Sequence, residues 1–311
     1  MSGRDALLAT IAGETRRAVS VEAQALSAAL RQRHGETVRA TMFYGSCLRP
    51  PTPDAVGPGG ADERLYDFYV LVDDLRAANG TWLRAVGNRL LPPNVYFLQI
   101  PVSAGTLRCK YAVLTLEQFA HGCSGRHFHN YFWGRFAQPA AVPFARDEPT
   151  RAALDAALAD AIATLIGRTA PLLDPGAGPE AMWTRAFAES YRCELRPEPP
   201  ARAGQIYRAD AARYDAIARD ALAAAGLSDT GQGSRMRTRL AWALRRLAGK
   251  TFNVLRLVKA SATVADGIDY ILWKIERHSG IRPSLTPWQR RHPLLAAPGL
   301  AWKLYRQGAF R

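Results

Sequence analysis

The sequence predicts an α+β fold, in which a mixed sheet with helical cover precedes a mainly helical region and a basic C-terminal stretch. Short apolar runs of strand length lie in the first part of the chain, whereas apolar residues at helical spacing dominate the rest. At 311 residues the chain is long enough for two domains with their own cores. We expect a sheet domain over 1–150, a helical domain over 151–260 that completes its cleft, and a basic amphipathic region over 261–311.

Each element follows from its residue pattern. The segment 4–33 has apolar residues close to helical spacing and is expected to pack ahead of the sheet. Four apolar runs predict strands over 38–44, 65–72, 94–100 and 107–114. Helices are expected over 115–121 and 152–166, and near 181–195, 207–226 and 235–258. The last of these carries one apolar stripe, which we interpret as core positions: Leu240, Leu244, Leu247, Val254 and Val258.

The positive charge of the chain is concentrated near its C-terminus. Residues 235–311 hold 16 Lys and Arg against 3 Asp and Glu, a net of +13 out of +14 for the whole chain. Such a region attracts an anionic membrane leaflet or a nucleic acid, or is a solvated basic face without a partner. The stretch 300–310 interleaves aromatic and basic residues, which suits a membrane interface, although a helix docked on the core is the alternative. The expected membrane contacts are Trp302, Lys303, Tyr305, Arg306 and Phe310.

The composition also bears on the compartment. No run of about 18 apolar residues is present, and the N-terminus has neither a secretory apolar segment nor the acid-poor, Arg-rich bias of a transit peptide. The four cysteines form no Cys-x-x-Cys pair, which indicates reduced thiols rather than a disulfide framework. We therefore expect a cytoplasmic protein whose contact with the inner face of a membrane is peripheral.

A short pattern near residue 45 points to a particular chemistry. The apolar run 38–44 leads directly into Gly45 and Ser46, and the run 65–72 carries one acid, Asp67. Glycine lets the backbone approach an anion closely, so that a Gly-Ser turn can hold the terminal phosphates of a nucleotide. A carboxylate on the next strand can hold Mg²⁺ (or Mn²⁺), which needs few protein ligands when phosphate oxygens supply the others. The pattern is typical of a nucleotidyltransferase palm of the polymerase-β type.

The pattern is incomplete, because such a palm usually carries two acids at alternate positions of the same strand. Tyr69 stands at the second position, and Asp73, on the same face, lies about 20 Å farther along an extended strand. A strand-end turn followed by a surface aspartate gives the same pattern without any nucleotide chemistry. Both interpretations stay open on these residues alone.

Five stretches resemble, in order, the motifs of the mitochondrial translocator assembly and maintenance family, the mitochondrial-type phosphatidate cytidylyltransferases. They are 44–46 (YGS), 66–74 (YDFYVLVDD), 110–113 (KYAV), 130–139 (NYFWGRFAQP) and 190–196 (SYRCELR). The family makes CDP-diacylglycerol and pyrophosphate from CTP and phosphatidic acid, and the resemblance implies this reaction at a membrane surface for a bacterial relative. Tyr69 in place of a second acid is then the family's own pattern. The chain departs from the family at Cys47 (Gly in the family), Gln138 (Lys) and Glu194 (Asp).

The resemblance also implies roles for individual residues. It implies that Asp67 and Glu194 hold Mg²⁺ or Mn²⁺ and, with Lys110, act in catalysis. The nucleotide- and phosphate-binding residues that it implies are Gly45, Ser46, Lys110, Tyr131, Arg135 and Arg196. Each of three residues also has an alternative, purely structural interpretation. Lys110 could be a solvent-facing lysine on an edge strand, Arg135 could cap backbone carbonyls, and Glu194 could form a surface ion pair with Arg192 or Arg196.

Two other functions are compatible with the same features. An enzyme that adds nucleotides to RNA or another small acceptor would explain both the palm and the basic tail, but such enzymes usually retain the paired acids. An inactive palm that serves as a membrane or nucleic-acid adaptor would also lack one acid. The expected partners are CTP, phosphatidic acid and an anionic membrane surface, and no nucleic acid.

Overall fold

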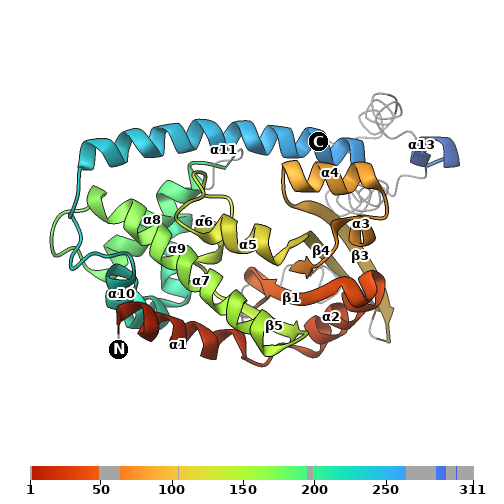
Figure 1. Cartoon of the computed structure of the whole chain (residues 1–311), viewed down its shortest axis with the longest axis horizontal. Helices are drawn as coiled ribbons and strands as arrows, with labels where there is room; N and C mark the ends of the chain where they lie inside the picture. Colours follow the sequence, from red (N-terminus) through yellow and green to blue (C-terminus); the bar gives the residue numbers. More distant parts are fainter. Residues whose placement is uncertain are drawn as a thin grey trace.

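The computed structural model describes residues 2–48, 64–103, 105–194, 199, 201–263, 285–291 and 299. Arg196 lies outside the described residues, as do the membrane contacts expected at Trp302, Lys303, Tyr305, Arg306 and Phe310. The fold is α+β, as the sequence predicts, and consists of one five-stranded mixed sheet with helices packed around it (Figure 1). None of the described helices combines the length and the apolar character needed to cross a bilayer.

The sheet has the strand order β3-β4-β2-β1-β5. Its strands are β1 (Val38–Tyr44), β2 (Leu65–Val72), β3 (Asn94–Val102), β4 (Gly105–Thr115) and β5 (Ala140–Ala145). β2 and β4 run parallel, and the other neighbouring pairs are antiparallel. The four predicted strands are confirmed. β5 was not predicted, because it is short and contains Pro143, which is tolerated here since β5 is an edge strand.

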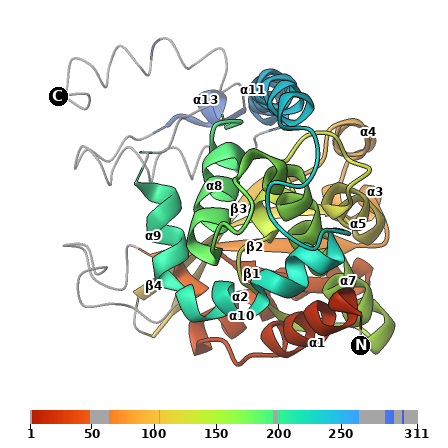
Figure 2. The same ribbon diagram turned by 90° about the vertical axis from the view of Figure 1, so that its left-hand side faces the viewer.

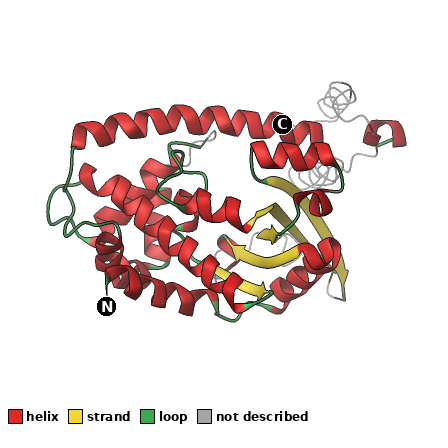
Figure 3. Cartoon of the chain, viewed as in Figure 1, coloured by secondary structure: helices red, strands yellow, loops and turns green. Residues whose placement is uncertain are grey.

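Helices cover both faces of the sheet (Figure 3). α2 (Val21–His34) packs Leu26 and Leu30 against one face, where Phe68 and Val70 of β2 are buried. The opposite face carries α1 (Gly3–Thr15), α5 (Leu116–Cys123), α6 (Trp133–Phe136) and α7 (Glu148–Thr169). The expected helical segment 4–33 is therefore two helices, and the Ser20 side chain caps the second by accepting a hydrogen bond from the Ala23 amide.

The remaining helices extend the apolar core away from the sheet. They are α8 (Pro179–Tyr191), α9 (Arg202–Ala209), α10 (Ala211–Ala224) and α11 (Arg235–Thr263), with the short α3 (Leu75–Asn79), α4 (Trp82–Leu90) and α13 (Pro287–Arg291) elsewhere. α1 packs on α10, and one apolar cluster joins sheet residues such as Met42 to Trp183 of α8. The division at residue 150 stays a prediction, although this core contains residues from both sides of it.

The expected burial of the apolar stripe on α11 is wrong. Leu240, Leu244, Leu247 and Val254 are 61%, 50%, 68% and 45% exposed, and the side chain of Val258 lies outside the described residues. The helix instead buries its opposite side, where the indole N–H of Trp242 donates to the Arg168 carbonyl at 2.7 Å. Gly249 follows on that side, and a Cβ there would lie 2.6 Å from the Cys193 carbonyl oxygen. Close packing on this side leaves the leucine stripe facing outward.

Candidate functional site

The sheet register places Tyr44, Asp67 and Lys110 in one row across three neighbouring strands. Tyr44 of β1 pairs with Asp67 of β2, and Asp67 pairs with Lys110 of β4. The Lys110 Nζ lies 3.1 Å from Asp67 Oδ1, which is buried and accepts no hydrogen bond from the described residues, so the contact with Lys110 is electrostatic. The edge-strand alternative for Lys110 is wrong, because β4 lies between β3 and β2. Asp67 thus keeps an oxygen with unused hydrogen-bonding capacity inside the site.

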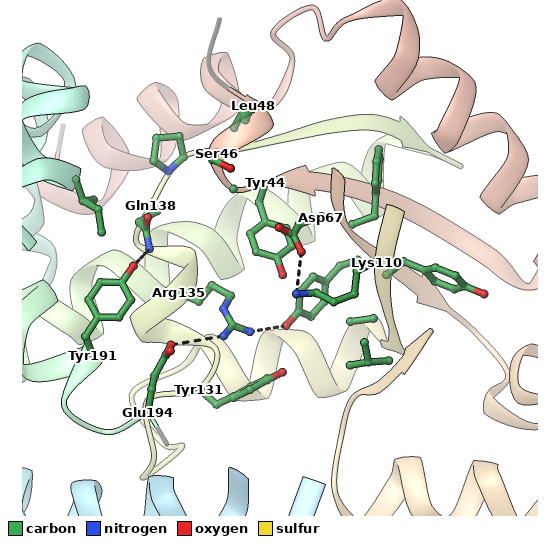
Figure 4. A pocket seen from close by; sticks show the side chains of 18 of the residues that line it. Tyr44, Ser46, Leu48, Asp67, Lys110, Tyr131, Arg135, Gln138, Tyr191 and Glu194 are labelled. Carbon is green, nitrogen blue, oxygen red and sulfur yellow. Dashed lines mark hydrogen bonds and ion pairs between the residues drawn. The ribbon is translucent and has the colours of Figure 1, made fainter. Parts of the chain in front are cut away.

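The Gly-Ser turn follows β1 and lies beside Asp67. Gly45 has φ +89°, and a Cβ at this position would lie 3.2 Å from Asp67 Oδ2, so the turn needs glycine for both its conformation and its closeness to the carboxylate. The chain then enters a single 3₁₀ turn, Ser46–Leu48. Cys47, where the resembled family has glycine, donates its thiol to the Leu65 carbonyl at 3.4 Å and ties the turn to β2. Figure 4 shows Ser46 near the same opening as Asp67.

Arg135, on the short helix α6, connects two parts of the site. Its Nη1 donates to the Tyr69 hydroxyl at 3.4 Å, and its Nη2 lies 3.6 Å from Glu194 Oε1. Within the described residues Arg135 donates to no backbone carbonyl, so the carbonyl-capping alternative lacks support. Tyr69 is 1% exposed, and its ring packs at 4.8 Å from that of Phe136. The position at which a nucleotidyltransferase palm would carry a second acid is thus filled by an aromatic side chain whose hydroxyl contacts Arg135.

Glu194 faces Arg135 rather than Asp67. It follows the end of α8 at Tyr191, and its amide donates to the Tyr191 carbonyl at 3.0 Å. In Figure 4 the Arg135 guanidinium lies between the Glu194 carboxylate and the Asp67–Lys110 pair. The alternative partner Arg192 instead contacts Glu189 at 3.0 Å. The structure therefore brings the two predicted metal ligands into one site, but with a cation between them.

These groups line one cavity of about 420 Å³. Tyr131, Gln138 and Tyr191 also face it, and Gln138 donates to the Tyr191 hydroxyl at 3.3 Å (Figure 4). Arg17, which follows α1, and Arg202, at the start of α9, add two cations from the helical side. These two arginines were not predicted from the sequence, because neither lies in a motif. The cavity is lined by cations from four separate segments, which suits a ligand with more than one phosphate.

Two guanidiniums lie close to the ring of Tyr131. Arg135 lies 4.7 Å from the centre of its ring, and Arg256 of α11 lies 3.8 Å from it. Burial alone would raise the pKa of Tyr131, but Arg135 and Arg256 outweigh it and lower this pKa. Burial raises the pKa of Tyr44 on the other side of the cavity. The two guanidiniums therefore favour the ionised form of Tyr131, whereas burial disfavours that of Tyr44.

The donor set fits a magnesium ion that arrives with phosphates. Asp67 offers a buried oxygen that no hydrogen bond occupies. Within the part of the chain that the structure describes, no three His, Cys, Asp or Glu side chains gather into a metal-binding group. Magnesium is commonly held by one or two carboxylates together with substrate phosphates and water, so Asp67 suffices as its main protein ligand. Glu194 would have to leave Arg135 to become a second.

Comparison with known proteins adds no family to these observations. No protein-family model matches the chain, and no curated protein matches it. The functional conclusion therefore rests on the geometry of the cavity and on the motifs that line it.

Proposed function

We propose that this protein is a magnesium-dependent nucleotidyltransferase that forms CDP-diacylglycerol and pyrophosphate from CTP and phosphatidic acid. The observation that carries the proposal is the row of Asp67 and Lys110 beside the Gly45-Ser46 turn, with Arg135 in the same cavity. An anion-binding turn, one carboxylate and two cations are the parts that phosphoryl transfer requires.

The reaction needs positioning and charge neutralisation rather than a strong base. An oxygen of the phosphatidic acid phosphate attacks the α-phosphorus of CTP, and the new P–O bond forms as the bond to the β-phosphate oxygen breaks. The electron pair of that bond leaves with pyrophosphate. The attacking phosphate is already ionised near neutral pH, so no side chain has to remove a proton from it. The described lining of the cavity contains no histidine, which fits this requirement.

The chain's own residues divide this work. The amides and hydroxyl of the turn at Ser46 bind the triphosphate, and Lys110 and Arg135 neutralise its charge. Bound Mg²⁺ would neutralise charge on the departing pyrophosphate, with Asp67 holding it. Lys110 lies 3.1 Å from Asp67, and we propose that it turns to the phosphates when nucleotide binds. Arg17 and Arg202 line the helical side of the cavity and would bind the lipid phosphate once it is inside.

The test is a transfer assay with the purified full chain. Each labelled ribonucleoside triphosphate is incubated with magnesium and one acceptor: phosphatidic acid in detergent micelles, tRNA or an oligonucleotide. We expect CTP and phosphatidic acid to give a CDP-lipid and pyrophosphate. Extension of RNA without a lipid product would favour the RNA-modifying alternative, and no transfer to any acceptor would overturn the proposal.

A further inference from the structure

One side of the molecule exposes apolar side chains from two neighbouring helices. α4 and α11 lie side by side in both Figure 1 and Figure 2, and Lys259 of α11 donates to the Pro93 carbonyl just beyond α4 at 2.9 Å. Their exposed apolar residues define what we call the outer face: Trp82, Leu83, Val86 and Leu90 of α4, and Met236, Leu240, Leu244, Leu247, Val254 and Leu255 of α11.

The exposure on α11 is regular. Leu240, Leu244 and Leu247 recur at intervals of four and three residues, so they form one stripe along the helix. Trp242 and Arg245, which point to the other side, are 1% and 4% exposed. Scattered single apolar residues are normal on a protein surface, but a continuous stripe over several helical turns marks an interaction site.

The charge on these helices indicates the kind of partner. α11 carries eight Arg and Lys and no Asp or Glu, and α4 carries two Arg and no acid. Arg235 and Arg246 pair with acids of neighbouring segments and Arg245 is buried, so these three do not contribute to the outer face. The exposed Arg237, Arg239 and Lys250 flank the leucine stripe. A second copy of this chain would bring two cationic helices together, and a nucleic acid would leave the leucines without an apolar partner. An anionic bilayer offers both an apolar interior and negative headgroups.

We infer that the outer face of α4 and α11 lies on an anionic lipid bilayer, with the leucine stripe at the level of the acyl chains and the flanking basic residues at the headgroups. The same helix reaches the cavity from its other side, because Arg256 lies over the ring of Tyr131 at 3.8 Å. The inference rests on the proposed function only in giving the lipid substrate a side from which to enter. Membrane binding is measured without CTP, so the membrane inference and the proposed transferase function can fail separately.

The apolar arm of the test uses sedimentation of the full chain with vesicles of phosphatidylcholine mixed with phosphatidylglycerol. The double variant Leu240→Ser with Leu247→Ser should partition about tenfold more weakly, because two side chains that enter the interface are lost. Val21→Ser on α2 is the matched control, because Val21 is 84% exposed and lies outside the outer face. We expect this variant to bind as the native chain does, and all variants to keep its thermal unfolding midpoint.

The charge arm separates lipid from other partners. Arg239→Gln with Lys250→Gln should weaken binding to the same vesicles about fivefold per charge, and should leave binding to pure phosphatidylcholine unchanged. Arg219→Gln, an exposed arginine on α10, is the matched control and should bind normally. Native binding by the serine double variant would overturn the inference. Two other results for the serine double variant would also overturn the inference. One is a change from dimer to monomer in light scattering, and the other is a loss of RNA binding while vesicle binding is kept.

Discussion

The cavity and the outer face of α4 and α11 arrange their charges in opposite ways. In the cavity, Lys110 lies 3.1 Å from Asp67 and Arg135 lies 3.6 Å from Glu194, so these two cations each have an acid beside them. On the outer face, the exposed Arg237, Arg239 and Lys250 of α11 flank the leucine stripe, and α11 contains no Asp or Glu. Paired charges bring a site closer to neutrality, and under the proposed function a nucleotide with its metal would rearrange the pairs. A basic helix that contains no acid favours an extended negative surface.

The two arrangements predict different sensitivities to substitution. In the cavity, removing one charge of the Lys110–Asp67 or Arg135–Glu194 pair leaves its partner without its counter-charge in a partly buried place, so the effect should be large. Charges on the outer face act independently, and each substitution should remove only a small increment. The following predictions test the cavity side of this comparison, from the largest expected effect to the smallest.

Asp67→Asn should have the largest effect. The amide keeps the shape of the side chain but removes the charge that balances Lys110 and that, under the proposed function, would hold the metal. We expect the turnover rate to fall by about a thousandfold or more, with the fold retained. Transfer of label from CTP to lipid and the thermal unfolding midpoint are the two measurements.

Asp73→Asn is the matched control for that change. Asp73 directly follows β2 but contacts Arg146 at 2.6 Å and does not line the cavity. This variant should keep nearly native turnover. Equal losses of turnover in both variants would mean that the effect of Asp67→Asn is not specific to the cavity. Retained turnover in Asp67→Asn would show that Asp67 does not hold the metal.

Arg135→Lys tests whether the fork of the guanidinium matters beyond its charge. Lysine cannot reach the Tyr69 hydroxyl and the Glu194 carboxylate together, as Arg135 does at 3.4 and 3.6 Å. We expect kcat/KM for CTP to fall by about a hundredfold. Tyr69→Phe removes only the hydroxyl that orients the fork and should cost about tenfold. If Tyr69→Phe is fully active, the Tyr69 contact does not position Arg135.

The sequence predicted the sheet side of the molecule better than the helical side. The runs at 38–44 and 65–72 are apolar along their whole length and end at Gly45 or at charged residues, so β1 and β2 were found with their correct bounds. α11 has periodic apolar residues on one side and Trp242 on the other, and periodicity cannot tell which side is buried. The contact between Trp242 and the Arg168 carbonyl decides it, and that contact spans residues far apart in the chain.

The candidate site was likewise predictable only in part. Strand pairing brings together four residues that lie on or next to strands: Gly45, Ser46, Asp67 and Lys110. Their motifs were therefore sufficient to predict that they share one site. Glu194 was expected near the metal, but it contacts Arg135 instead. Its position could not be predicted, because no local sequence pattern indicates which residue of the cavity a loop will face. Arg17 follows α1 and Arg202 begins α9. They were missed because no local pattern indicates that these two segments meet at the cavity.

Ser46→Ala should affect nucleotide binding moderately. The change removes one hydroxyl from the turn that faces the cavity, while the backbone amides stay in place. A hydrogen bond to a charged group is worth roughly 1.5–3 kcal/mol, so we expect KM for CTP to rise by about tenfold or more with a smaller change in kcat. Ser124→Ala, which removes a hydroxyl bonded to the His121 carbonyl outside the cavity, is the control. Unchanged kinetics for Ser46→Ala would make the serine a structural part of the turn.

Gly45→Ala compared with Gly80→Ala separates backbone strain from closeness to the carboxylate. Both glycines have positive φ, +89° and +74°, so alanine should destabilise the fold by about 1 kcal/mol at either position. At Gly80 a Cβ would meet nothing within 4 Å, whereas at Gly45 it would lie 3.2 Å from Asp67 Oδ2 and push the carboxylate from its place. Urea unfolding should therefore give similar losses of stability for the two variants, while only Gly45→Ala loses transfer activity. Equal activity in the two variants would show that the distance between the turn and Asp67 is not part of the chemistry.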